Sequence, residues 1–280
     1  MTKKPLSELL EFGILNIDKS SGPTSFDVSD FVRKKLNLRK TSHFGTLDPK
    51  VTGVLPIALN RACKLTGFFI SHDKEYIGVM RLHEDVELDK IKAAIKKKFL
   101  GKINQVPPVK SRVKRQERER EIYEFELLEQ DGKDIMFRVK CQGGTYIRKL
   151  VDDLGKELGI GAHMLELRRI SAGIFSENDK EFVNLYDLDG ADEKKLREII
   201  IPAEDAIKKI MSSVLVEKYA IERLYTGKVF KKEDLVEKNK LKKGERFAAF
   251  SGEKFIGIYL VIDGKEIFAK PEFVMQPMRD

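Results

Sequence analysis

One carboxylate, Asp48, stands in a short loop sequence whose composition suits the fixing of a side chain in one orientation. Gly45 and Gly53 flank the loop and allow backbone conformations that other residues resist, and Pro49 restricts φ directly after the aspartate. The loop threonines can hydrogen-bond to nearby backbone groups. A carboxylate held in this way suits nucleophilic or general-base chemistry, whereas an ordinary turn capped by an aspartate is the structural alternative.

A longer run around this aspartate resembles the catalytic motif of the TruB-type pseudouridine synthases: GTLDPKVTGVLP, from Gly45 to Pro56. Its Pro-Lys-Val-Thr-Gly form is similar to the archaeal and eukaryotic branch, that of dyskerin and its archaeal homologues. The resemblance covers nearly the whole chain, with catalytic motifs between residues 13 and 169 and an end that is similar to a PUA RNA-binding domain. It implies an isomerase that converts uridine in RNA to pseudouridine and that needs no cofactor.

Arg148 is the predicted partner of Asp48. The sequence predicts a helix with Thr145 as its N-cap, and Arg148 falls in the first turn, where the helix dipole favours an anion over a cation. Another constraint, such as a fixed carboxylate partner, is therefore expected there. In the family, the Gly-Thr-Tyr-Ile-Arg signature supplies an arginine that pairs with the catalytic aspartate, and the resemblance carries this role onto Arg148.

The resemblance implies further site residues. Tyr76, in a Lys-Glu-Tyr run, matches a residue whose ring stacks on the flipped uracil and can assist proton removal at C5, and Leu167 matches one that walls the uracil pocket. Lys19 is expected to support the site or contact the RNA backbone, and Arg168 to support the site or reach phosphates. His43 matches a histidine that helps to take the place of the extruded base, although a hydrogen-bonded structural histidine is the alternative.

The sequence departs from the family pattern around His43. It reads Ser42-His43-Phe44, where relatives usually have glycine before the histidine and a small hydroxyl residue after it. Phe44 either adds a stacking face or packs into the core, and the sequence leaves both open.

The charge distribution favours an anionic partner, nucleic acid before a membrane surface. The chain has a formal net charge of +8, and twelve Lys or Arg against two Glu lie between Lys90 and Arg120, so that segment carries more net positive charge than the whole chain. The family has a similar Pro-Pro segment on its RNA face, which makes Lys110, Arg112 and Lys114 predicted RNA contacts. A solvated helix face followed by a loop is the alternative.

Composition argues against several other classes of protein. The two cysteines and four histidines include no pair at zinc spacing, so we expect no structural metal. No apolar run approaches 18 residues and the N-terminus lacks the shape of a signal peptide, so we expect a cytoplasmic protein with no membrane partner.

Hydrophobic periodicity predicts a mixed α and β chain. Strands are expected at 13–17, 123–127 and 135–141 and from Tyr76 onward, and helices after the N-caps Ser25 and Asp89. The family implies an α+β fold: a pseudouridine synthase catalytic domain over 1–210, with a mixed sheet, flanking helices and a central RNA cleft. A small PUA-like β-barrel is expected over 214–280.

Two modes of substrate selection follow from the resemblance. One is direct modification of the TΨC loop of tRNA, and the other is guide-directed modification of rRNA inside an H/ACA ribonucleoprotein, with a guide RNA and small H/ACA proteins as partners. The residues leave open whether Asp48 attacks the sugar, attacks the base or acts on a ribose proton. A non-catalytic RNA-binding or assembly protein is the alternative of a different class, but it would not need Asp48, Tyr76 and Arg148 together.

Overall fold

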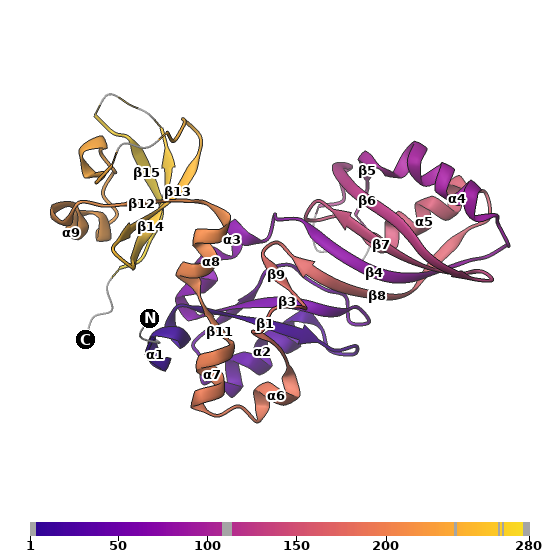
Figure 1. Ribbon diagram of the computed structural model, residues 1–280, viewed down its shortest axis with the longest axis horizontal. Coiled ribbons are helices and arrows are strands. Elements are labelled where there is room, and N and C mark those ends of the chain that lie inside the picture. Colours follow the sequence, from indigo (N-terminus) through magenta and orange to yellow (C-terminus); the bar gives the residue numbers. More distant parts are fainter. Residues whose placement is uncertain (1–3, 108–113, 238–239, 263, 265, 277–280) are drawn as a thin grey trace. The chain divides into compact units, whose positions relative to one another are not determined.

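The computed structural model divides into two compact units (Figure 1), Met1–Ile201 and Pro202–Asp280. It describes residues 4–107, 114–237, 240–262, 264 and 266–276. The first domain was predicted to end at residue 210, whereas the first unit ends at Ile201, before the helix that follows Pro202. The two functional domain assignments remain predictions.

One mixed sheet forms the centre of the first unit. Among the described residues, eleven strands join it: β1 (Gly13–Lys19), β2 (Thr41–His43), β3 (Thr52–Leu59), β4 (Lys74–Leu82), β5 (Gly101–Gln105), β6 (Arg118–Asp131), β7 (Asp134–Cys141), β8 (Ala162–Ala172), β9 (Phe175–Ser176), β10 (Phe182–Asn184) and β11 (Ile200–Pro202). The order is β10-β1-β3-β8-β4-β7-β6-β5, with β2 on β3, β9 on β8 and β11 on β1. β3 runs parallel to β8, which brings the end of the Asp48 loop beside Arg168 and Arg169.

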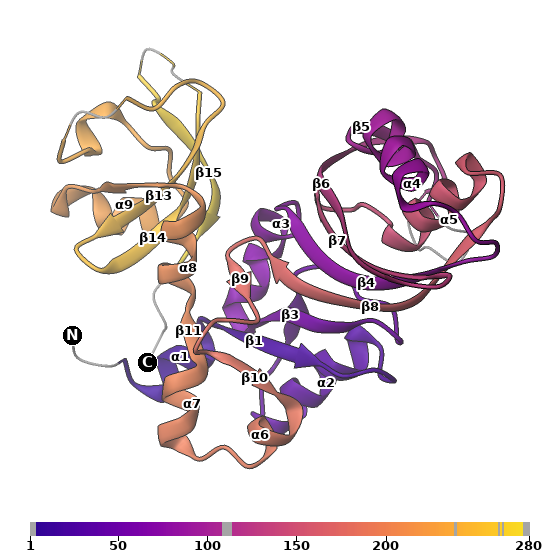
Figure 2. The same cartoon turned by 45° about the vertical axis from the view of Figure 1, so that its right-hand side comes forward.

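Helices cover this sheet. They are α1 (Leu6–Glu11), α2 (Ser25–Lys35), α3 (Thr66–Phe69), α4 (Leu88–Ala94), α5 (Ile147–Glu157), α6 (Leu185–Asp189) and α7 (Glu193–Ile199), with a 3₁₀ turn η1 (Asn60–Leu65) and a π-helical turn η2 (Ile95–Phe99). Figures 1 and 2 show α4 and α5 over one face of the part of the sheet formed by β4, β6, β7 and β8. α5 buries Ile147, Leu150, Val151 and Leu154 at helical spacing, and these residues join the main core.

The alternation predicted for 135–141 is confirmed. Ile135, Phe137, Val139 and Cys141 are buried, and the residues between them are exposed or half-buried. A sheet face that packs on helices requires this period of two, because successive strand side chains point to opposite faces.

The predicted starts of α4 and α5 are wrong by two residues and one residue. Glu87, not Asp89, is the N-cap of α4, and Asp89 lies inside the first turn. Tyr146, not Thr145, is the N-cap of α5, because the Thr145 hydroxyl donates to the Gln142 carbonyl 2.7 Å away and closes the preceding turn.

The second unit has its own sheet and core. Its elements are α8 (Ala203–Ile210), β12 (Ser212–Leu215), η3 (Lys218–Ala220), α9 (Ile221–Tyr225), η4 (Lys232–Asp234), β13 (Arg246–Ser251), β14 (Lys254–Val261) and β15 (Ala269–Val274). The strands pair in the order β12-β13-β14-β15, around a core that includes Phe230, Phe247 and Tyr259. Closure of this sheet into a PUA-like barrel stays a prediction. Across both units, none of the helices in the described part of the chain is long and apolar enough to cross a membrane.

Candidate active site

The Asp48 loop connects β2 to β3 and depends on glycine at both ends. Gly45 and Gly53 adopt φ values of +113° and +97°, which L side chains rarely reach. At Gly53 a Cβ atom would also lie 2.2 Å from the Arg169 carbonyl oxygen, so a side chain there would force the loop away from β8. Within the loop, the Val51 N–H donates to the Asp48 carbonyl at 3.0 Å. The backbone conformation around Asp48 is thus closely determined.

Lys19, the last residue of β1, stabilises this loop through hydrogen bonds to backbone carbonyl groups. Its side chain is fully buried, and its ammonium donates to the carbonyl oxygens of Ser20, Pro49 and Val51, each at 2.9 Å. Burial lowers the pKa of Lys19, and the nearby Asp48 carboxylate acts in the opposite direction. Of the two roles expected for Lys19, support of the site is the one that these contacts describe.

Replacement of Lys19 by Met should destabilise the protein by about 2–4 kcal/mol, because buried carbonyl groups lose their donor. The Pro49 carbonyl keeps the Gly22 N–H at 2.9 Å, so the main loss falls on Ser20 and Val51. Urea unfolding measures the change. Lys50→Met, an exposed lysine of the same loop, is the control. Equal stability of the two variants would contradict the anchoring role.

Ser25, the first residue of α2, stabilises the same loop through two hydrogen bonds, a role that was not predicted from the sequence. We predicted Ser25 as the N-cap, but Thr24 occupies that position and forms a reciprocal capping box with Asp27. The Ser25 hydroxyl is therefore not engaged in helix capping. It donates to the Leu47 carbonyl at 2.9 Å and accepts from the Leu47 N–H at 2.8 Å. The Thr-x-x-Asp spacing was the available signal for the correct cap.

An ion pair joins the loop to α5. Arg148 Nη2 lies 2.8 Å from Asp48 Oδ2, and the two side chains are 57% and 48% exposed. Arg148 is the second residue of α5, whose N-cap Tyr146 is held by the buried Gln105. The Tyr146 N–H donates to Gln105 Oε1 at 3.0 Å, and Gln105 Nε2 donates to the Tyr146 carbonyl at 3.2 Å. Gln105 therefore fixes the end of the helix that carries Arg148.

The β4–β8 register brings two predicted pocket residues to one face of the sheet. Tyr76 lies opposite Arg169 and Gly78 lies opposite Leu167, so Tyr76, Leu167 and Arg169 share a face. Tyr76 and Leu167 are each 8% exposed. Burial raises the pKa of the Tyr76 phenol, while the Arg169 charge opposes this shift. A phenol that stays protonated suits packing on a base better than it suits proton removal at C5.

Arg169, rather than Arg168, hydrogen-bonds to the backbone at both ends of the Asp48 loop. Arg169 is buried, and its Nε and Nη2 donate to the carbonyl oxygens of Val54 at 2.7 Å and Gly45 at 3.1 Å. Arg168 faces the other side of β8 and pairs with Asp18 at 3.0 Å and with Glu177 at 2.8 Å. Strand alternation was the signal that separates them, since only Arg169 shares a face with Leu167. The role of Arg168 toward RNA remains a prediction.

His43 is the last residue of β2, and Phe44 follows it. Burial, aided by the charge of Arg169, lowers the pKa of His43, so the imidazole is neutral at physiological pH. No described residue gives its buried Nδ1 a hydrogen bond. Phe44 is buried and stacks on Phe69, with ring centroids 4.7 Å apart. Of the two roles left open for Phe44, the structure shows packing.

The predicted basic contacts lie on or next to a segment outside the described residues. Lys110 and Arg112 fall within 108–113 and are not described, whereas Lys114 is exposed. The Lys114 carbonyl accepts a hydrogen bond from the Gln116 N–H at 2.9 Å. Among the residues that the structure does describe, no three or more His, Cys, Asp or Glu side chains gather in a group that could hold a metal ion.

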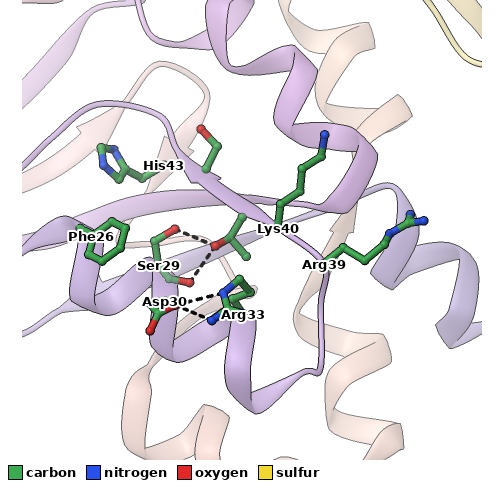
Figure 3. Close-up of a pocket in the computed structure, with 9 residues that line it drawn as sticks. Phe26, Ser29, Asp30, Arg33, Arg39, Lys40 and His43 are labelled. Atoms are coloured by element: carbon green, nitrogen blue, oxygen red, sulfur yellow. Dashed lines mark hydrogen bonds and ion pairs between the residues drawn. The ribbon is translucent and has the colours of Figure 1, made fainter.

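A cavity of about 310 Å³ opens between α2 and β2 (Figure 3). Its lining combines the phenyl ring of Phe26 with polar and charged side chains, three of them basic Arg or Lys: Phe26, Ser29, Asp30, Arg33, Arg39, Lys40, Thr41, Ser42 and His43. His43 belongs both to this cavity and to the predicted set of site residues.

Comparisons with known proteins agree with this arrangement of motifs. Residues 33–147 match the family described as TruB family pseudouridylate synthase (N terminal domain), and residues 148–208 match the tRNA pseudouridylate synthase B C-terminal domain. A protein named probable tRNA pseudouridine synthase B from Methanococcus aeolicus is 49% identical over 232 residues, covering 80% of this chain and 69% of the relative. Its namesake from Methanocaldococcus jannaschii is 46% identical over 231 residues, covering 80% and 68%.

Solved structures extend the likeness over nearly the whole chain. A chain of a Cbf5-Nop10-Gar1 complex superposes with a TM-score of 0.88 and 35% identity, covering 98% of this chain and 88% of that one. A chain from an H/ACA RNP bound to a substrate RNA containing 2′-deoxyuridine gives a TM-score of 0.85 and 34% identity, with the same coverage. The chain therefore belongs to the TruB family of pseudouridylate synthases, isomerases that convert uridine in RNA to pseudouridine.

Proposed function

We propose that Asp48 is the essential carboxylate of the isomerisation, that Arg148 orients it and that Tyr76 packs against the extruded uracil. The observation that carries this assignment is the 2.8 Å ion pair between Asp48 and Arg148. Side chains from β1, α2 and β8 hydrogen-bond to the backbone of the Asp48 loop, yet the side chains of Asp48 and Arg148 are each about half exposed. A carboxylate that is both fixed and accessible meets the geometric needs of a reacting group.

The chemistry needs the target nucleotide to leave the base stack, because its C1′–N1 bond is inaccessible in a folded RNA loop. That bond breaks, the uracil rotates, C5 is joined to C1′, and the proton released from C5 balances the one gained at N1. The atoms of the nucleotide are conserved and no electrons are lost or gained. Asp48 lies at the open side of the loop, and the buried Tyr76 and Leu167 form the apolar wall against which the base rests.

Direct action on the TΨC loop of tRNA is the first substrate assignment. It draws support from the relatives named probable tRNA pseudouridine synthase B, which match 80% of this chain. Guide-directed action on rRNA is the second, with an H/ACA guide RNA and small proteins akin to Nop10 and Gar1 as partners. It draws support from the likeness to chains of H/ACA complexes, which covers 98% of this chain.

The second unit is assigned to RNA binding as a PUA-like module over 214–280, and the residues before it, 1–210, to catalysis. A compact sheet with its own aromatic core supports an independent module. We assign the protein to the cytoplasm, since both of its cysteines are free thiols, as is usual in a reducing compartment.

The test is pseudouridine formation by the purified protein on an unmodified tRNA transcript. Product at the TΨC-loop uridine would establish guide-independent action. If tRNA is unchanged, the assay is repeated with a guide RNA, its rRNA target and the small partner proteins. Product only in that second assay would assign the guide-directed mode, and product in neither would favour the non-catalytic RNA-binding alternative.

A further inference from the structure

Phe26 is a large apolar side chain left in solvent at the edge of the site. It is 71% exposed, while its α2 neighbours Ser25 and Val28 are buried. A single exposed apolar residue needs no explanation by itself. Phe26, however, follows Ser25, whose hydroxyl holds Leu47, the residue before Asp48. It also shares a cavity of about 310 Å³ with His43. Figure 3 shows the two rings at the same end of that cavity.

The other end of the cavity carries hydrogen-bond donors. Arg33 donates hydrogen bonds from Nε and Nη2 to Asp30, and Arg39 donates from Nη2 to Glu11. The other N–H groups of both guanidinium groups can therefore donate to a ligand. Lys40 lines the same cavity, and none of the carboxylates in the described ranges lies within 4.0 Å of its ammonium. The cavity thus combines one aromatic face with a cation that lacks a carboxylate partner in the described ranges.

This combination matches the chemistry of a single-stranded nucleotide. Extrusion of the target uridine removes a stacking partner from the nucleotide beside it in the strand. An aromatic side chain replaces such a partner without regard to base identity, and a nearby cation binds the phosphate. Two links connect the cavity to the Asp48 loop: Phe26 is adjacent in sequence to Ser25, which hydrogen-bonds to Leu47, and the cavity-lining His43 ends the strand from which the loop begins.

We propose that this cavity is a subsite for the nucleotide adjacent to the target uridine, in which Phe26 stacks on the base and Lys40 contacts its phosphate. The subsite rests on the proposed function of the chain as an RNA isomerase. It assigns a substrate-binding role to two residues that the Asp48 motif does not include.

The first test combines protein and RNA variants. Phe26→Ala should weaken binding of an unmodified tRNA transcript by roughly 5- to 150-fold, the range for loss of one base–aromatic stack. Phe26→Tyr should bind as the wild type does. Tyr186→Ala is the matched control, because Tyr186 is 87% exposed on α6 and does not line the cavity. An abasic nucleotide on one side of the target uridine should abolish the difference between wild type and Phe26→Ala, and the side identifies the stacked neighbour.

The second test isolates the phosphate contact. Lys40→Gln should reduce the slope of log Kobs against log salt concentration by about 0.7, the value for one phosphate of a single strand. Lys194→Gln, an exposed lysine of α7, should leave the slope unchanged.

Several outcomes would overturn the subsite. Phe26→Ala binding as tightly as Tyr186→Ala would show that Phe26 does not meet RNA. A loss that persists with abasic nucleotides on both sides would assign Phe26 to a contact with another part of the RNA. An unchanged salt slope for Lys40→Gln would remove the phosphate contact. Because these readouts are binding equilibria, they stand apart from the isomerisation assay: a wild type that forms no pseudouridine refutes the proposed function, while the RNA-binding comparison still tests Phe26.

Discussion

Asp48→Asn should abolish pseudouridine formation while leaving RNA affinity within about a factor of two of the wild type. The amide preserves the size of the side chain but removes the charge that a nucleophile or base requires, a loss of roughly 10³-fold or more. The fold should hold, since the Asp48–Arg148 pair is half exposed and such pairs add about 1 kcal/mol or less to stability. Nucleoside analysis of the RNA after single-turnover reaction measures the product, and filter binding measures affinity.

Asp85→Asn is the control for this experiment, because Asp85 is an exposed loop aspartate away from the Asp48 loop. It should retain full activity. If Asp48→Asn isomerises uridine at the wild-type rate, the catalytic assignment is wrong. If instead it fails to bind RNA, the loop serves recognition rather than chemistry.

Arg148→Met should lower the single-turnover rate by about 100-fold with little change in stability. The arginine fixes the carboxylate, and misplacement of a reacting group by about 1 Å costs on that order. Arg148→Lys should recover most of the loss. The ion pair joins Nη2 to Oδ2 at 2.8 Å, and an ammonium can supply one contact of this kind.

Rate and urea-unfolding measurements on the two variants separate positioning from folding. A Met variant that unfolds several kcal/mol more easily than the wild type would mean that Arg148 supports the fold instead of the carboxylate. A Lys variant as slow as the Met variant would mean that the planar guanidinium itself is needed, for example to contact RNA.

The parts of the site that the sequence predicted are those whose information is local. The Asp48 loop carries its glycines and proline within a dozen residues, and the Ile135–Cys141 alternation is a property of a single strand. Arg148 was predicted from the local Gly-Thr-Tyr-Ile-Arg run that resembles the family signature, and its place in the first turn of a helix, which conflicts with the helix dipole, pointed to another constraint there. Even so, the start of that helix was misplaced by one residue, because capping depends on which hydroxyl is already engaged.

The parts that the sequence did not predict depend on contacts between distant segments. Arg169 reaches the carbonyl of Gly45, 124 residues away, and Gln105 holds Tyr146, 41 residues away. No local pattern records such pairings, because they arise only when the sheet fixes which strands are neighbours. The contact of Ser25 with Leu47 is of the same kind, although the local Thr-x-x-Asp spacing did indicate that Thr24 is the N-cap.

The three side chains that stabilise the Asp48 loop share one property: each forms hydrogen bonds with backbone atoms. Lys19 and Arg169 bind carbonyl oxygens, and Ser25 binds the N–H and carbonyl of Leu47. These contacts therefore do not depend on the side chains that the loop displays, and a substitution at an exposed position such as Lys50 leaves them intact. An insertion or deletion is different, because it would shift every carbonyl out of register with its donor. The length of this loop is therefore constrained more tightly by the fold than the identity of its exposed side chains.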